Sequence, residues 1–168
     1  KMARSLPETL TVKDVEKLLG QPDSLSPLGL RDRAMLEILY ATGMRVSELV
    51  RLPLNQLNLE GGFVLLYGKG SKERVVPLGR EAMEWIRLYL RTGRGALLRK
   101  KESPFLFVDR SGTRISRQSF WKTLKTYGET TRIRDRMFDF NGLNAILGTN
   151  EIVAGATRYD ATLKKAAE

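Results

Sequence analysis

The spacing of apolar residues changes twice along this chain, and this change limits the possible folds more than any other feature. In the first 52 residues the apolar positions repeat at helical intervals, as Val15, Leu18 and Leu19 show. Residues 63–67 and 74–78 instead have the composition of two strands joined by a basic hairpin tip. Helical spacing returns at about residue 80. The pattern predicts an α+β domain, mostly helical with a small three-stranded antiparallel sheet.

Capping residues predict where several of the helices begin and end. Thr11 followed by Asp14 is typical of a capping box. Gly43 is expected to end a helix over residues 28–42, and Ser116 is expected to cap a helix with an apolar stripe. The remaining expected elements are a short helix at 46–52, a helix at 80–91, the third strand at 105–108, and late helices at 139–147 and from 157 to the end.

The composition excludes several classes of enzyme. The chain has 168 residues, the usual size of one domain, and contains neither histidine nor cysteine. A disulfide framework, a thiol nucleophile, a site with imidazole or thiolate metal ligands and a Ser-His-Asp triad are therefore excluded. An all-carboxylate Mg²⁺ or Ca²⁺ site remains open, and acid–base chemistry would depend on Lys, Arg, Tyr, Asp or Glu.

The positive charge is concentrated in the middle of the chain. The net charge is +10, and residues 71–136 carry 17 Lys and Arg against 7 Asp and Glu. The rest of the chain carries 12 of each sign and is neutral. A localised basic excess favours a polyanion, because each neutralised phosphate releases counterions. The partner expected from charge is nucleic acid, and the alternative is the solvated surface of a basic protein.

The hydropathy pattern contains no sign of a membrane segment. No stretch approaches the roughly 20 apolar residues that span a bilayer, and residues 1–10 lack the apolar run of a secretion signal. We therefore expect a cytoplasmic protein without a membrane partner.

Three segments contain residues suited to phosphate chemistry. Arg45 lies between two expected helices, where a guanidinium can reach a phosphate; the alternative is a surface pair with Glu48. Lys69 lies between two glycines in the hairpin tip, where the backbone can approach a ligand closely, although charged hairpin tips also serve solubility. Tyr159 lies late in the chain, where most tyrosines are packing or surface residues.

Four ordered segments resemble one family. Residues 30–49, 68–79, 105–108 and 116–121 are similar to the catalytic domain of the tyrosine site-specific recombinases (phage integrase family), specifically the Xer type. The resemblance covers about residues 5–128 and leaves 129–168 divergent or rearranged. It implies a single catalytic-type domain over residues 1–168, without the amino-terminal DNA-clamping domain of the family.

The resemblance implies a role for each of the three candidate residues. Arg45 would bind the scissile phosphate, Lys69 would protonate the leaving 5′-oxygen, and Tyr159 would form a 3′-phosphotyrosyl intermediate without a metal or nucleotide. The resemblance implies no metal and no cofactor. The substrate would be double-stranded DNA, with no small-molecule substrate. Family members act as tetramers on DNA, so a homo-oligomer or a hetero-oligomer with another recombinase is implied. From charge and position, the expected DNA-binding residues are Lys72, Arg74, Arg114, Arg117 and Lys122.

The last third of the chain departs from the family pattern. The family has a His-x-x-Arg motif and a Leu-Gly-His before its tyrosine, whereas this chain has no histidine and has Thr149 after Leu147-Gly148. Three explanations stay open: the segment is deleted or replaced, residues 129–168 are unrelated to the family, or other cations substitute, for example from a neighbouring subunit. We expect impaired DNA cleavage. The alternatives are a non-catalytic DNA-binding or partner-binding module of the same fold and, less favoured, a basic RNA-binding protein.

Overall fold

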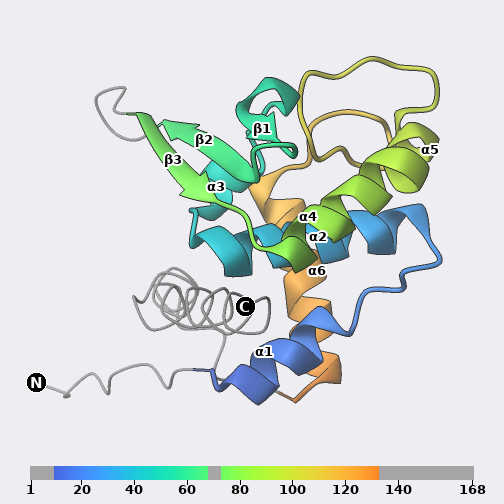
Figure 1. Ribbon diagram of the computed structural model, residues 1–168. Coiled ribbons are helices and arrows are strands. Elements are labelled where there is room, and N and C mark those ends of the chain that lie inside the picture. Colours follow the sequence, from blue (N-terminus) through green and yellow to red (C-terminus); the bar gives the residue numbers. More distant parts are fainter. Residues whose placement is uncertain (1–9, 68–72, 133–168) are drawn as a thin grey trace, which may run out of the picture.

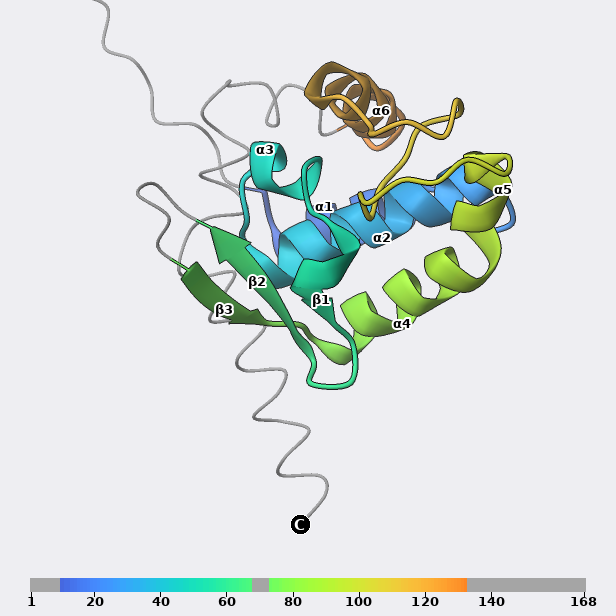
Figure 2. The ribbon, with the colours of Figure 1, turned by 90° about the horizontal axis from the view of Figure 1, so that it is seen from above.

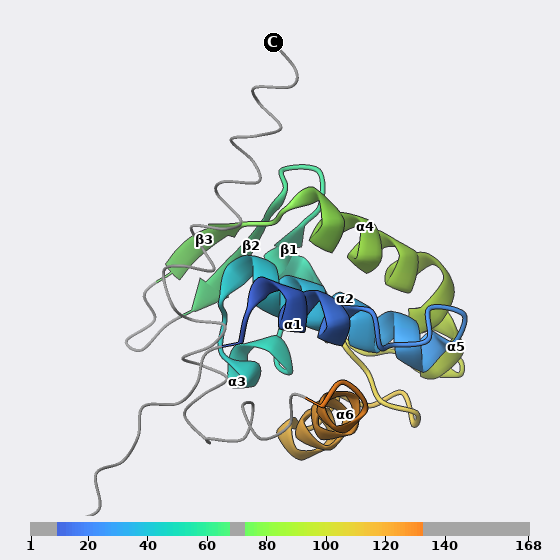
Figure 3. The same cartoon turned by 90° about the horizontal axis from the view of Figure 1, so that it is seen from below.

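Helix α2 (Pro27–Thr42) lies at the centre of the described structure, between α4 and α6 (Figures 2 and 3). The computed structural model describes residues 10–67 and 73–132 (Figure 1). Proline is the first residue of α2, and the Ser26 hydroxyl accepts a hydrogen bond from the Gly29 N–H at 3.0 Å. Gly43 ends the helix with a φ of 59°, so the helix predicted at 28–42 is confirmed.

Helix α1 (Val12–Leu19) packs on α2 and begins at the predicted capping box. The Thr11 hydroxyl accepts from the Asp14 N–H at 3.2 Å, and the Asp14 carboxylate accepts from the Thr11 N–H at 3.0 Å. After α2 come the short α3 (Val46–Leu49) and the 3-10 turn η1 (Leu54–Gln56). The helix expected at 46–52 thus ends three residues early, in a turn.

The sheet is antiparallel and has the strand order β1-β2-β3. It consists of β1 (Leu57–Asn58), β2 (Phe63–Tyr67) and β3 (Glu73–Pro77), with Phe63 opposite Pro77 and Tyr67 opposite Glu73. Its buried face carries Val64 and Leu66. The predicted hairpin and the count of three strands are confirmed, which agrees with the predicted α+β class.

The third strand is not the predicted segment at 105–108. Phe105 forms only an isolated bridge with Pro53, and Val108 forms another with Arg114. Pro53 and Pro104 have no N–H to donate, so a longer ladder cannot form there. The segment is instead attached by two backbone hydrogen bonds, from Leu54 N–H to Pro104 O and from Leu106 N–H to Leu52 O, each 2.8 Å.

The helix predicted at 80–91 changes its winding before it ends. Helix α4 (Arg80–Leu88) continues through a π-helical turn, η2 (Tyr89–Gly93), into α5 (Arg94–Leu98). A Cβ at Gly93 would lie 3.1 Å from the Tyr89 ring and 3.3 Å from Leu30, so close packing favours glycine there. The Arg94 guanidinium then donates to the carbonyls of Ser103 and Phe105 at 2.8 Å and of Leu106 at 3.1 Å.

Helix α6 (Arg117–Thr130) lies across the opposite side of α2 from α4 (Figure 3). Ser116 caps it as predicted, because its hydroxyl accepts from the Ser119 N–H at 3.0 Å. Phe120 and Leu124 are buried in the common core. The helices expected at 139–147 and from 157 onward lie outside the described residues. Within 10–67 and 73–132, no helix is long and apolar enough to cross a membrane.

Candidate functional site

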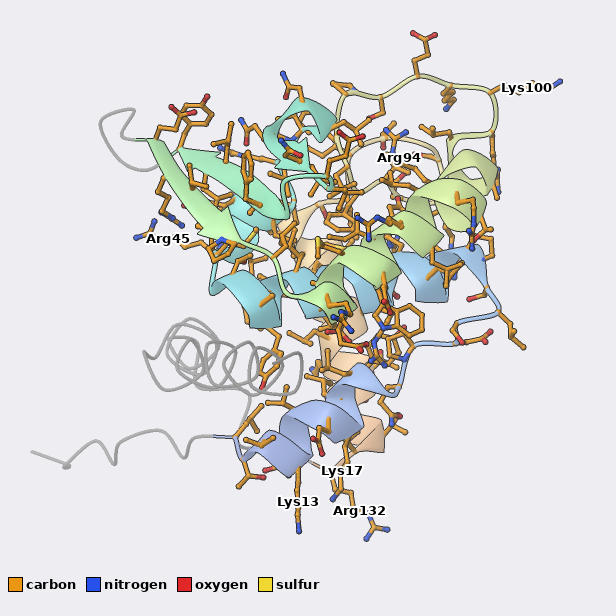
Figure 4. All side chains as sticks on the ribbon, in the orientation of Figure 1. Lys13, Lys17, Arg45, Arg94, Lys100 and Arg132 are labelled. Carbon is orange, nitrogen blue, oxygen red and sulfur yellow. The ribbon has the colours of Figure 1, made fainter. Side chains whose placement is uncertain are left out.

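Arg45 occupies the junction between α2 and α3, where its backbone is fixed and its side chain is open. Its N–H donates to Glu48 Oε2 at 2.7 Å, which satisfies a free donor at the start of α3. Met44, the preceding residue, is buried in the core. The Arg45 side chain is nevertheless 64% exposed, and Figure 4 shows it extending outward beside α3 and β3. The residue therefore presents a positioned cation to solvent.

Glu48 connects Arg45 with Arg74 of β3. Glu48 Oε1 lies 3.4 Å from Arg45 Nη1, and Oε2 accepts a hydrogen bond from Arg74 Nη2 at 2.9 Å. The pair with Glu48 that was an alternative for Arg45 does form, but it is long and leaves most of the guanidinium exposed. Arg74 makes the shorter contact, and its assignment to DNA binding stays a prediction.

The base of the β2–β3 hairpin lies beside these cations. Tyr67 faces Glu73 across the sheet, and its hydroxyl donates to Glu73 Oε1 at 3.2 Å. This hydrogen bond and the negative charge of Glu73 raise the pKa of Tyr67 above its ordinary value. Lys69 and Lys72 belong to the connection between the strands, and Tyr159 to the last third of the chain; all three lie outside the described residues.

A cavity of about 360 Å³ lies against Arg45. Its other lining residues are Ser47, Glu48, Arg51, Gln56, Leu66 and Tyr67. The sequence analysis missed Arg51, an exposed residue in the turn after α3. The sequence indicates only that Arg51 is a cation six residues after Arg45. Its place on the cavity wall could not be predicted, because that place depends on how distant segments pack around the turn.

Arg114 and Arg117 lie together on a second cavity, of about 430 Å³, at the start of α6. Arg51 also lines this cavity, so the two cavities share one arginine. Lys122 does not join this group. It lines a third cavity, of about 800 Å³, whose wall includes the buried Asp32. The structure thus brings two of the predicted DNA-binding residues together and places Lys122 elsewhere on α6.

A buried polar network connects α2 to α6 and to residue 108. The Arg31 guanidinium donates to Asp32 Oδ1 at 2.6 and 2.9 Å and to the Val108 carbonyl at 3.2 Å. Tyr127 donates its hydroxyl proton to Asp32 Oδ2 at 2.9 Å. Burial raises the pKa of the Asp32 carboxyl, although the charge of Arg31 opposes the shift. Burial and the Asp32 charge together raise the pKa of Tyr127 strongly.

None of the four described tyrosines has a lowered pKa. The chain has five tyrosines, and four of them lie in the described residues. Burial raises the pKa of Tyr89 to about 12 and also raises the pKa of Tyr40. Burial and the charge and hydrogen bond of Asp32 raise the pKa of Tyr127, and the hydrogen bond to Glu73 raises the pKa of Tyr67. A lowered pKa, as nearby cations would give, is one way to activate a phenol as a nucleophile at neutral pH. None of these four environments supplies it.

The part of the chain that the structure describes also contains no group of three or more Asp and Glu side chains that could hold a metal ion. The expectation of chemistry without metal stays a prediction.

Comparisons with known proteins agree with this fold. The phage integrase family model matches residues 8–156. Tyrosine recombinase XerD of Pseudomonas aeruginosa is 51% identical over 132 residues, which cover 79% of this chain and 44% of that protein. Tyrosine recombinase XerD of Xanthomonas campestris is 43% identical over 162 residues, which cover 93% of this chain and 50% of that protein. The chain thus spans about half the length of these relatives.

Solved structures show the same architecture. The XerA recombinase matches with a TM-score of 0.67 and 21% identity, over 98% of this chain and 66% of that chain. The XerH site-specific recombinase in a pre-cleavage complex with difH substrate matches with a TM-score of 0.67 and 25% identity, over 86% of this chain and 41% of that chain. The resemblance predicted from the four segments is confirmed: the chain belongs to the phage integrase family.

Proposed function

We propose that this chain is the catalytic domain of a site-specific recombinase that breaks and rejoins double-stranded DNA. The observation that carries the proposal is the exposed Arg45 guanidinium beside a cavity, on a backbone that Glu48 holds in place. A fixed cation of this kind suits a phosphodiester, whose transition state concentrates negative charge on its oxygens. The family match and the DNA complex of the similar XerH recombinase support DNA as the substrate.

The proposed reaction needs no external energy source. The Tyr159 oxygen attacks the phosphorus as the hydroxyl proton passes to solvent water. The bond from phosphorus to the 5′-oxygen breaks, and Lys69 donates a proton to that oxygen. Arg45 stabilises the charge on the nonbridging oxygens. The product is a 3′-phosphotyrosyl link and a free 5′-hydroxyl. Because the phosphodiester energy is kept in that link, attack by a 5′-hydroxyl reseals the strand and releases the tyrosine.

The assignment of Tyr159 is supported by its place in the sequence, which agrees within one residue with the position of the nucleophile in the family.

The rate of cleavage is proposed to be low. The family motifs place two histidines and a second arginine on the phosphate, and this chain has no histidine. Removing one such donor from a preorganised site slows a reaction by about 10²–10³. The same observation favours a second candidate function: a DNA-binding or partner-binding module of this fold that does not cleave. We further propose that several copies of the protein bind the DNA together and that the protein acts in the cytoplasm.

A suicide substrate tests the proposal directly. A duplex nicked close to the cleavage position traps the phosphotyrosyl intermediate, because the short fragment with the free 5′-hydroxyl diffuses away. We expect a slow covalent adduct that Tyr159→Phe abolishes, while the matched variant Tyr40→Phe, on α2, keeps it. DNA binding without any adduct would favour a DNA-binding module that does not cleave. Failure to bind DNA would exclude both the recombinase and the DNA-binding module and would leave only a partner-binding module.

A further inference from the structure

Three arginines converge on one cavity without a carboxylate to neutralise them. The cavity of about 430 Å³ at the start of α6 is lined by Val50, Arg51, Arg114, Ile115, Ser116, Arg117, Gln118 and Trp121. None of its three guanidinium groups forms a salt bridge with another described residue. All three arginines are exposed. The cavity wall therefore has three positive charges and no negative charge.

The other two cavities differ in this respect. The cavity beside Arg45 contains Glu48, which pairs with both Arg45 and Arg74. The large cavity beside Lys122 contains three aspartates, one of them paired with Arg31. Like charges that meet without a counter-charge repel each other, and a bound anion removes this repulsion. The cavity at the start of α6 is therefore the one of the three best suited to an anion.

The backbone holds these arginines in place independently of any ligand. Arg114 forms a bridge with Val108, and its guanidinium lies over the Phe105 ring at 5.4 Å from the ring centre. The Arg51 N–H donates to the Glu48 carbonyl at 3.2 Å. Because the backbone and one guanidinium are already positioned, binding an anion orders little additional structure.

The cavity lining also includes apolar residues, which limit the kinds of anion that fit it. Val50 and Ile115 line the cavity and are buried, and Trp121 lines it and is half-buried. A free inorganic ion has no apolar part to place against these groups. A sugar–phosphate backbone presents both charged oxygens and the carbons of deoxyribose, so it matches a lining that contains both basic and apolar residues.

We propose that this cavity binds a DNA backbone phosphate next to the one at Arg45, and that Arg51 contacts the backbone between them. Arg51 lines both cavities and so joins them into one basic track. The inference rests on the proposed function, because it takes DNA as the ligand. It adds a residue and a second phosphate position that are not needed for the chemical step itself.

The salt dependence of DNA binding tests this inference. The full 168-residue chain is titrated into two labelled duplexes of unrelated sequence between 50 and 200 mM salt. Loss of one phosphate contact reduces the slope of log K against log salt by about 0.9. We therefore expect Arg51→Gln to bind both duplexes more weakly. Between 50 and 200 mM salt, the fold-decrease in affinity of this variant should be about three times smaller than that of the original chain. Arg51→Lys keeps most of the slope.

Arg91→Gln is the matched control, since Arg91 is an exposed arginine on η2 that lines none of the three cavities. Equal slopes for Arg51→Gln and Arg91→Gln would overturn the inference, as would a loss confined to one duplex, which would indicate a base contact. Thermal unfolding of each variant, together with the charge-retaining Arg51→Lys, separates lost contacts from lost structure. The Tyr159 adduct reports the proposed function separately: its absence beside a reduced Arg51→Gln slope would leave this inference standing.

Discussion

The Tyr127 hydroxyl donates a 2.9 Å hydrogen bond to Oδ2 of Asp32, across 95 positions of sequence, and attaches α6 to the central helix. Asp32 is 4% exposed, and its other oxygen accepts from Arg31. A buried carboxylate needs partners for both oxygens, because an unsatisfied buried acceptor is costly. The first cavity of the basic track is lined by residues of α3, and the second by residues at the start of α6. The hydrogen bond between Tyr127 and Asp32 therefore helps to fix the position of one cavity relative to the other.

Tyr127→Phe removes that bond and leaves Asp32 Oδ2 without its donor. We expect the free energy of unfolding to fall by about 1–3 kcal/mol, the usual cost of an orphaned buried polar group. Urea denaturation measures the change. Tyr40→Phe, which removes a half-buried hydroxyl from the outer part of α2, provides the comparison, and equal effects of the two variants would contradict the role of the hydrogen bond.

Glu37 makes stability depend on pH in an unusual direction for a carboxyl group. Burial raises the pKa of Glu37 above 4.5, although the charge of Arg33 opposes the shift. The folded state therefore binds this proton more tightly than the unfolded state. The resulting stability is fully present below pH 4.5 and is lost as pH rises through the folded pKa. Glu37→Gln should flatten that part of the stability profile.

Urea denaturation at a series of pH values measures the Glu37 effect. Glu102→Gln, at an exposed position, is the control and should leave the profile unchanged. A Glu37→Gln profile with the same slope as the original chain above pH 4.5 would show that another group controls stability in this range.

Arg94→Lys should destabilise the segment at residues 103–106. The planar guanidinium reaches three carbonyl oxygens at 2.8–3.1 Å, whereas an ammonium group cannot match this geometry. We expect a loss of about 2–4 kcal/mol, because more than one charged hydrogen bond is broken. Thermal unfolding monitors the loss, with Arg91→Lys as the comparison. The Arg114 guanidinium lies over the ring of Phe105, which belongs to this segment. Arg94→Lys should therefore also weaken DNA binding.

Gly43→Ala tests the backbone conformation that precedes Arg45. Gly43 has a φ of 59°, in the left-handed region that costs a residue with a Cβ about 1–2 kcal/mol. Stability should fall by about that amount, and adduct formation should fall with it if the junction positions Arg45. Gly95→Ala is the control, because Gly95 lies in α5 with open space around its Cα, where alanine is favourable.

Local chemistry explains which parts of the fold could be predicted. The capping box at Thr11, the left-handed Gly43 and the cap at Ser116 are all determined by neighbours within four residues, and each was correct. The strand predicted at 105–108 was wrong because Pro53, distant in sequence, cannot donate to its ladder. The π-helical turn at 89–93 was missed because its packing against Leu30 involves a separate helix.

Some residues of the candidate site could be predicted from the sequence, and others could not. Arg45 could be predicted from its junction, and Arg114 and Arg117 from their charge near a helix start. Arg51 could not, because only the folded chain places residues 50–51 beside 114–117. The buried Arg31 and Asp32 look like part of a solvated helical face in the sequence, and their burial depends on α6 and on residue 108.

The turn after α3 is anchored on both sides. The Arg51 N–H donates to Glu48 O, and the Leu52 carbonyl accepts from the Leu106 N–H at 2.8 Å. The number of residues in this turn therefore sets the distance between the two basic cavities. The phosphates of DNA follow one another at a fixed distance. A single residue inserted after Arg51 would therefore change the distance between the cavities so that it no longer matches the phosphates, although every arginine would still be present.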